Sequence, residues 1–295
     1  MEKNILHIKR WSFVLFITVL LAAIIGVFSI GGTPIEITSI HGETILLHNN
    51  GVYRFDSVSV AMQAIAQDFV TIIVWGSLFI IAIIKLKEKS EFSKLFFLGL
   101  LGYSLYAYMS YTFLSHFNEL FLLYVWNMSL SLYLLIRGMT LLKLEEVNKF
   151  YSKPLPLKRT IAFLIFLALM LSGMWLARIV PALSPNIQPF GLESYHTLPI
   201  QAMDLGFIVP LTLFSTYYLF KKRPIGYALT AILLFKGAAL FTAVATMAIV
   251  QGFMDESVNF VEIGIFLSLT IVAIYIMIIF FKRSIINQDK KTSSN

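Results

Sequence analysis

Two charged residues stand inside apolar stretches long enough to cross a membrane, and they are the first candidates for chemistry in this chain. Asp204 lies in an apolar span that contains Pro210, and Lys236 lies near the middle of the next span, across a short basic turn at residues 221–224. A carboxylate or an ammonium inside hydrocarbon is costly unless it is paired or faces a cavity. Because spans joined by a short turn are antiparallel neighbours, we expect Asp204 and Lys236 to reach each other.

Two interpretations of Lys236 stay open. In the first, the lysine forms a structural ion pair that fixes the packing of the helices; in the second, it belongs to a site for a solute, a proton or an anion. Pro210 has no N–H and its ring removes the hydrogen bond to the carbonyl of Gly206, so a kink is expected just below Asp204. Broken helices at membrane depth occur in transporter binding sites, which favours the second interpretation.

Polar residues from five apolar stretches are expected at a similar depth. Counted from the nearest basic residue at the inner end, four of them lie about 25 Å above the inner boundary, and Lys236 lies about 20 Å above it. Its long side chain can reach several ångströms further. We therefore predict an outward-opening pocket for a small polar or anionic solute, in which Asp204 holds the lysine until solute or proton displaces it. The residues expected to line the pocket are Asp68, Asn127, Asp204, Lys236, Tyr108, Tyr111 and Gln67.

Several of these residues also have an ordinary structural explanation. Asp68, Glu119, Asp204 and Glu262 lie near predicted outer helix N-termini, where unpaired N–H groups and the helix dipole favour a carboxylate. Glu119 and Glu262 are interpreted as helix caps, whereas Asp68 and Asp204 lie about two turns deeper. Gln67 is explained equally well by solvation, and the tyrosines by packing with a satisfied hydroxyl.

The composition is that of a membrane protein. Hydrophobic residues make up 58% of the chain and charged residues 13%, and apolar runs repeatedly reach the length of about 20 residues that spans a bilayer. The predicted fold is an all-α, multi-pass transmembrane helix bundle of about eight spans, in one domain over residues 1–281, followed by a cytoplasmic tail over 282–295. The predicted spans cover residues 11–30, 68–84, 95–114, 119–142, 160–180, 202–220, 225–250 and 259–281.

The net charge of +7 is explained by membrane topology. If the N-terminus is cytoplasmic, all but four of the 23 basic residues fall in inner segments, so the positive-inside rule places both termini in the cytoplasm of a cell-membrane protein. The lipid bilayer is the expected partner, and no nucleic acid is expected. The first run could instead be a signal peptide cut near Gly31, which would not change the orientation of the rest.

The external loop over residues 31–67 is the one long extramembrane segment that the sequence predicts. Residues 35–40 and 44–48 alternate around a turn and predict a short β-hairpin. From Ser57 the apolar spacing becomes helical, which predicts an amphipathic helix capped by Asp56 or Ser57. An alternative function follows from this loop: a non-enzymatic membrane sensor or assembly factor that binds a partner through the hairpin.

Enzyme chemistry has little support in the sequence. The chain has no cysteine, and its five histidines all lie outside the predicted spans, which argues against haem or di-iron ligation. No zinc-protease, nucleophile-elbow or phosphate-loop motif is present. We therefore expect no catalytic residue, metal or cofactor, and a membrane enzyme acting on lipid is a third alternative.

The chain resembles a known protein family over most of its length. The stretches that carry the resemblance are residues 51–71 (GVYRFDSVSVAMQAIAQDFVT), 101–125 (LGYSLYAYMSYTFLSHFNELFLLYV) and 204–212 (DLGFIVPLT), together with Phe235, Lys236 and Gly237. In these stretches the protein resembles a family of uncharacterised prokaryotic polytopic membrane proteins. The resemblance implies the same helical membrane topology. It implies no activity, cofactor or catalytic residue.

Overall fold

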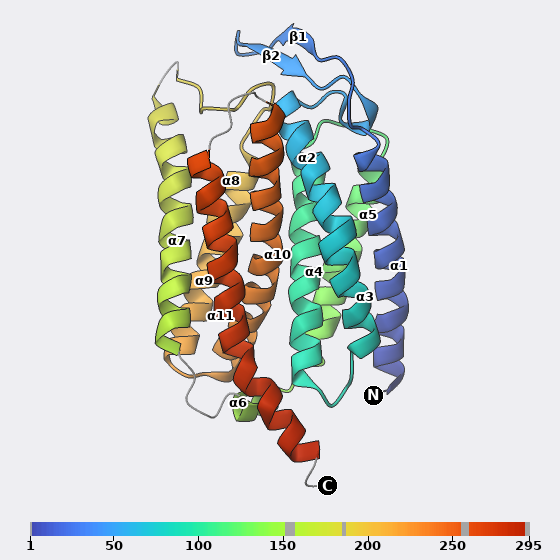
Figure 1. The fold of residues 1–295 in the computed structure, drawn as a ribbon, viewed down its shortest axis with the longest axis vertical. Coiled ribbons are helices and arrows are strands. Elements are labelled where there is room, and N and C mark those ends of the chain that lie inside the picture. Colours follow the sequence, from blue (N-terminus) through green and yellow to red (C-terminus); the bar gives the residue numbers. More distant parts are fainter. Residues whose placement is uncertain (1, 151–156, 185–186, 255–259, 293–295) are drawn as a thin grey trace.

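The protein is a bundle of long helices with a small β-hairpin at one end, as a computed structural model shows (Figure 1). The structure describes residues 2–150, 157–184, 187–254 and 260–292. Among these residues, seven helices are long and apolar enough to cross a membrane. Many of their large apolar side chains face outward, as Leu169 and Ile271 do, and only a bilayer offers such side chains a favourable environment. The chain is therefore a multi-pass, all-α integral membrane protein.

The helices fall into two groups, which lie side by side in Figure 1. The first group contains α1 (Glu2–Val27), the broken helix α2–η2–α3 (Val58–Val70, Thr71–Trp75, Gly76–Lys85), α4 (Glu91–Phe113) and α5 (Phe121–Met139). The second contains α7 (Leu157–Ile179) with the turn η3 (Val180–Leu183), the broken helix α8–η4–α9 (Pro199–Met203, Asp204–Ile208, Val209–Phe220), α10 (Pro224–Met254) and α11 (Phe260–Thr292). The short α6 (Leu144–Phe150) connects the groups at the end opposite the hairpin.

The third predicted span, residues 95–114, forms the helix α4 but is not among the seven apolar helices. Its tyrosines and other polar residues lower its hydropathy. It does not need a lipid-facing surface, because it packs against α5 on one side and α10 on the other. Leu95, Leu98 and Leu101 are fully buried between these neighbours. The prediction of about eight spans is therefore met by seven apolar helices and one central helix, counted within the described part of the chain.

The predicted hairpin is confirmed. Strand β1 (Ile35–Thr38) pairs antiparallel with β2 (Thr44–Leu47), and the 3₁₀ turn η1 (Gly51–Tyr53) follows. Helix α2 begins after Ser57, whose side chain accepts a hydrogen bond from the backbone N–H of Val60. Ser57 is thus the cap, and the Asp56 side chain belongs to a separate cluster that is described below.

Both broken helices contain one wide π-helical turn. In η4 the N–H of Val209 bonds to the carbonyl of Asp204, five residues back, and Pro210 follows at the start of α9. The break expected below Asp204 is therefore present as a wide turn. In η2 the N–H of Gly76 bonds in the same way to the carbonyl of Thr71, although no proline marks that position.

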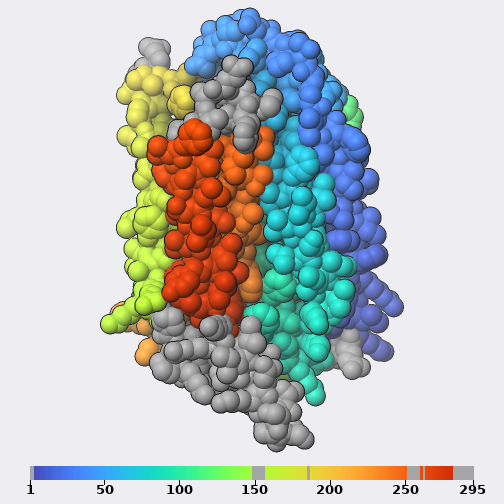
Figure 2. All heavy atoms as spheres, in the orientation of Figure 1, coloured from blue at the N-terminus to red at the C-terminus, as the bar shows by residue number. Residues whose placement is uncertain are grey.

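The two groups of helices meet where α4 crosses α10. Gly99 makes this contact possible, because a Cβ at Gly99 would collide with the Cβ of Phe235 and lie 3.2 Å from the carbonyl oxygen of Ile232. Phe92, Phe96 and Phe235 pack ring to ring beside it. Figure 2 shows side chains filling the space between α10 (orange) and α2 and α3 (cyan), so the two groups form one continuous body.

Replacing Gly99 with alanine should therefore separate α4 from α10. Overpacking a close contact costs roughly 1–3 kcal/mol, which exceeds the gain in helix propensity of about 1 kcal/mol from removing a glycine. The midpoint of thermal unfolding in detergent should fall. Gly102→Ala is the matched control on the same helix, because a Cβ there would lie 3.7 Å from the Lys236 side chain, an ordinary contact. Equal midpoints for the two variants would contradict this account.

Candidate functional site

The buried carboxylate of Asp68 is held by two tyrosine hydroxyls. Tyr53, from the outer turn η1, donates to Oδ2 over 2.7 Å, and Tyr111, from α4, donates to Oδ1 over 2.8 Å. The backbone of α1 approaches so closely at Gly26 that a Cβ there would collide with this carboxyl group. Asp68 is 2% exposed, and no cation lies against it within the described residues. Neutral donors therefore satisfy this carboxylate.

Further polar residues extend this first cluster towards α1 and α5. The Tyr108 hydroxyl donates to the carbonyl of Val19, and the Asn127 amide donates to the carbonyl of Thr18. The ring of Tyr124 stacks on that of Tyr111, with 5.2 Å between the centroids. Two of these donors end on α1 carbonyls, so α1 packs as part of the bundle.

Two polar atoms of the first cluster are buried and have no hydrogen-bond partner in the described structure. They are Oδ1 of Asn127 and the hydroxyl of Tyr124. Buried polar groups in proteins are nearly always paired, so each of these atoms calls for an explanation. Both belong to residues of α5.

The Gln67 side chain forms a hydrogen bond with another tyrosine of α4, Tyr103. Its amide Nε2 donates to the Tyr103 hydroxyl over 2.6 Å, and that hydroxyl lies 3.3 Å from Oγ1 of Thr71. This contact fixes α2 and η2 against α4 at the first residue of the wide turn. Gln67 is 5% exposed, so the solvated alternative is wrong for this side chain.

The buried carboxylate of Asp204 forms a second cluster with the other face of α4. Tyr106 donates to Oδ1 over 2.7 Å, and the indole N–H of Trp175, from α7, donates to Oδ2 over 2.8 Å. Asp204 is 6% exposed. Like Asp68, it is held by neutral aromatic donors.

Lys236 lies in this second cluster but does not bond to Asp204 directly. Its ammonium nitrogen lies 4.0 Å from the centroid of the Tyr106 ring, a cation–π contact. The side chain is 5% exposed. Among the described residues, no acceptor forms a hydrogen bond or ion pair with this ammonium group, and Asp204 is the acid that interacts with it electrostatically. Tyr106 therefore contacts both charged groups, the ammonium through its ring and the carboxylate through its hydroxyl.

The residues expected in one pocket thus lie in two clusters, one in each group of helices. Asp68 and Tyr111 share a hydrogen bond, and Tyr108 and Asn127 lie beside them. Gln67 contacts neither aspartate; it contacts the α4 tyrosine between the clusters. Asp204 and Lys236 form the second cluster through Tyr106. Tyr103 and Tyr106, two further tyrosines of the third predicted span, also bond in the site, and the residues that the sequence analysis did not anticipate are Tyr53 and Trp175.

A third polar cluster lies at the end of the bundle that carries the hairpin. The carboxylate of Asp56, 1% exposed, accepts from the backbone N–H of His116 over 2.8 Å and from the Tyr195 hydroxyl over 2.9 Å. His116 Nδ1 lies 3.2 Å from the same oxygen. Burial, and then the nearby Asp56 carboxylate, raise the pKa of Tyr195 far above its ordinary value, so its hydroxyl stays a donor. The loop before α8 is thereby joined to the external loop.

Glu119 does not cap α5 as expected. It forms an ion pair with Arg54 of the external loop, and the hydrogen bond from Arg54 lowers the pKa of the Glu119 carboxyl. The cap residue of α5 is Leu120, which makes no side-chain cap bond. The side chain of Glu262, the other predicted cap, lies outside the part of the chain that the structure describes.

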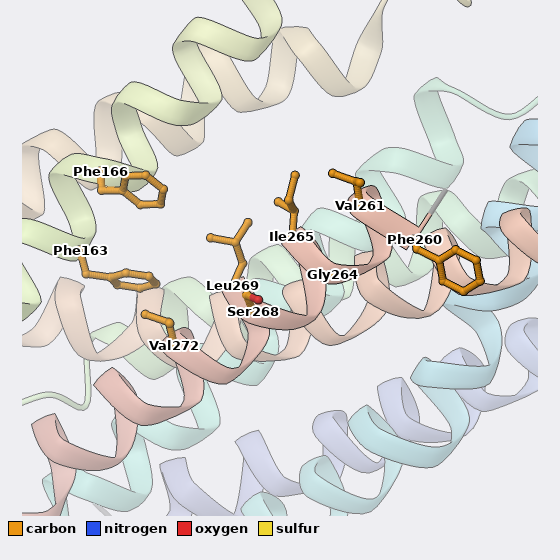
Figure 3. A pocket seen from close by; sticks show the side chains of 9 residues that line it. All are labelled: Phe163, Phe166, Phe260, Val261, Gly264, Ile265, Ser268, Leu269 and Val272. Atoms are coloured by element: carbon orange, nitrogen blue, oxygen red, sulfur yellow. The ribbon is translucent and has the colours of Figure 1, made fainter. Parts of the chain in front are cut away.

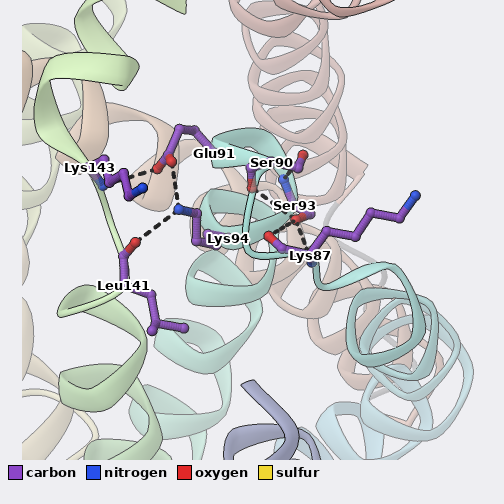
Figure 4. Close-up of polar contacts among 7 residues, drawn as sticks. All are labelled: Lys87, Ser90, Glu91, Ser93, Lys94, Leu141 and Lys143. Atoms are coloured by element: carbon purple, nitrogen blue, oxygen red, sulfur yellow. Dashed lines mark hydrogen bonds and ion pairs between the residues drawn. The ribbon is translucent and has the colours of Figure 1, made fainter. Parts of the chain in front are cut away.

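A buried ion pair stands at the inner end of α4 (Figure 4). The Lys94 ammonium lies 2.5 Å from Oε1 of Glu91 and donates to the carbonyl of Leu141 over 2.9 Å. The other Glu91 oxygen accepts from the backbone N–H of Lys143. These bonds satisfy backbone groups just beyond the end of α5, so this pair has all its partners and fixes α4 to α5.

An apolar groove of about 550 Å³ lies between α7 and α11 (Figure 3). Phe163 and Phe166 of α7 face Leu269 and Val272 of α11, and the Ser268 hydroxyl is its one polar side-chain group. The groove holds none of the predicted site residues. Such a lining suits hydrocarbon, and it lacks the convergent polar groups that a polar solute requires. Among the described residues, no group of three or more histidine, aspartate or glutamate side chains comes together to hold a metal ion.

Replacing Tyr106 with phenylalanine tests the second cluster. The variant keeps the ring beneath Lys236 and removes one of the two donors to Asp204. A buried charged acceptor that loses a partner costs roughly 1–3 kcal/mol, so the thermal unfolding midpoint in detergent should fall. Tyr133→Phe is the control, because that hydroxyl meets His7 at an exposed position. An unchanged midpoint in Tyr106→Phe would show that the bond to Asp204 contributes no stability.

No protein-family model, curated protein or solved structure matches this chain. The resemblance to a prokaryotic membrane family therefore stays a prediction, and the chemistry of the site must be argued from its own geometry.

Proposed function

We propose that the protein is a carrier of the cell membrane that binds a small anionic solute at Lys236. The buried ammonium of Lys236 carries this proposal. A lysine has three N–H donors, and here they meet only the face of the Tyr106 ring among the described residues. Buried charges in proteins are normally paired and hydrogen-bonded. A solute carboxylate or phosphate would supply the acceptors that the ammonium lacks.

The neighbours of Lys236 favour an added anion over a permanent ion pair with Asp204. Both oxygens of Asp204 already accept a hydrogen bond, one from Tyr106 and one from Trp175. Tyr106 contacts both groups, the carboxylate through its hydroxyl and the ammonium through the face of its ring. The lysine is thus held near a negative charge without being neutralised by contact, and an incoming anion does not have to break a short ion pair.

The surrounding helices have features that transport requires. Asp204 is the first residue of a π-helical turn, and such turns inside helices frequently lie at functional sites. The cluster also lies where α4 of one group meets α7, η4 and α10 of the other. In many carriers the solute site lies between two groups of helices, and access alternates as one group rocks against the other.

The test is ligand-induced stabilisation of the purified protein, followed by uptake into proteoliposomes. A panel of small organic anions and inorganic phosphate should contain at least one member that raises the thermal unfolding midpoint of the wild type. Stabilisation of about 2.7 kcal/mol is expected when the ligand is at 100 times its Kd. The same ligand should lose its effect in Lys236→Met.

Two variants make this test specific. Lys236→Arg keeps the positive charge and should retain part of the stabilisation, whereas Lys87→Met removes an exposed inner lysine and should retain all of it. If Lys236→Met takes up and binds every anion of the panel as well as the wild type, the proposed function is wrong.

A second candidate function is that of a membrane sensor or assembly factor. The observation in its favour is the exposure of large apolar side chains on the hairpin, with Ile40 81% exposed and Leu46 48% exposed. Replacing residues 35–47 with a short glycine linker should then abolish the cellular phenotype while Lys236→Met leaves it intact. The opposite pattern would support the carrier.

A further inference from the structure

The hydroxyl of Tyr111 has two acceptors and one proton. It lies 2.8 Å from Oδ1 of Asp68 and 3.1 Å from the backbone carbonyl oxygen of Ala64. A phenolic hydroxyl donates one hydrogen bond at a time and can accept others. Its proton can therefore point to Asp68 or to Ala64, and the arrangement is complete in either case.

These two orientations correspond to two protonation states of Asp68. When the carboxylate is ionised, Tyr111 donates to Oδ1. When Oδ1 carries a proton, Tyr111 donates to Ala64, and its oxygen accepts a hydrogen bond from the Oδ1–H group of Asp68. Tyr53 donates to Oδ2 in both states. Neither state leaves a buried donor of this group unpaired, which is the condition for a buried acid to exchange protons without rearranging its surroundings.

We infer that Asp68 is a proton-binding site, in which the Tyr111 hydroxyl turns between Asp68 and Ala64 as the proton leaves and returns. On release, the proton passes from Oδ1 to water, the carboxylate stays behind, and the hydroxyl proton of Tyr111 swings from Ala64 to Oδ1. The site is separate from the Lys236 cluster and does not depend on the solute proposed above.

Among the described residues, no positively charged side chain contacts the Asp68 carboxyl group. Two titratable side chains bond to it, Tyr53 and Tyr111, and three more tyrosines interact with it electrostatically: Tyr103, Tyr108 and Tyr124. The charged residues on neighbouring elements belong to the other clusters: Lys236 and Asp204, and at the outer end Arg54, Asp56, His116 and Glu119. None of them contacts the Asp68 carboxyl among the described residues. A proton is the cation that fits, because both carboxylate oxygens already have a hydroxyl donor.

The experiment is infrared difference spectroscopy of the full chain in detergent, recorded as the pH is lowered over the range in which the protein stays folded. The C=O stretch of a protonated carboxylic acid should grow as the pH falls. Asp68→Asn should remove the part of this band that comes from Asp68, which the wild-type spectrum minus the variant spectrum separates from the bands of the other acids. Asparagine has the size of the protonated acid, accepts from Tyr53 and donates to Tyr111, so the variant should fold. Asp204→Asn is the control and should keep the signal.

Three results would overturn the inference. The wild-type spectrum minus the Asp68→Asn spectrum could contain no acid band at any pH, which would mean a permanently ionised carboxylate. It could contain a band that does not change with pH, which would mean a permanently protonated one. The pH-dependent band could also disappear in Asp204→Asn and not in Asp68→Asn.

Tyr111→Phe tests the role of the turning hydroxyl. The carboxylate loses a donor in this variant, so the ionised form is less stabilised and the midpoint of the band should move to higher pH. Tyr133→Phe is the control, because its hydroxyl meets His7 at an exposed position and does not bond to Asp68. Equal midpoints in Tyr111→Phe and the wild type would contradict the proposed role of Tyr111. Since no solute is present, the result is independent of the test of the carrier.

Discussion

A charge inside a membrane bundle has no water to solvate it, so the protein must supply every partner from its own side chains, and this constraint explains much of the structure. Asp68 and Asp204 are both met by aromatic donors: two tyrosines in one case, a tyrosine and a tryptophan in the other. Aromatic side chains suit this position because their rings pack against apolar neighbours while one polar atom reaches the carboxylate. The two charges are thereby accommodated without two buried ion pairs.

The same constraint explains the composition of α4. This helix has neighbours on opposite sides, and it presents a tyrosine to each neighbour that carries a polar group. Tyr103 meets Gln67, Tyr106 meets Asp204 and Lys236, Tyr108 meets α1, and Tyr111 meets Asp68. A helix so placed cannot be as apolar as its neighbours. The low hydropathy that sets α4 apart from the seven candidate spans follows from its central position.

The sequence was sufficient to predict the helical class, the order of the spans and the hairpin. These depend on the composition and spacing of residues along one helix. It was not sufficient to predict which side chains meet, because depth does not determine the direction in which a residue faces. Asp68 and Asp204 were predicted at one depth, yet they belong to different groups of helices. The π-helical turn at Thr71–Trp75 has no proline to mark it. The partner of Lys236 is the face of the Tyr106 ring, and nothing in the order of residues predicts that contact.

Because of the two π-helical turns, the number of residues in each of these helices determines the direction in which its carboxylate points. The same number of residues separates Asp68 from Lys85 as separates Asp204 from Lys221, and each interval contains one π-helical turn. The extra residue in such a turn rotates the helix beyond it by about 100°. Losing a single residue between the acid and the inner lysine would restore a regular helix and turn the carboxylate away from its aromatic donors, even with every side chain of the site retained. The helices α2–η2–α3 and α8–η4–α9 should therefore tolerate changes of residue type far better than changes of length.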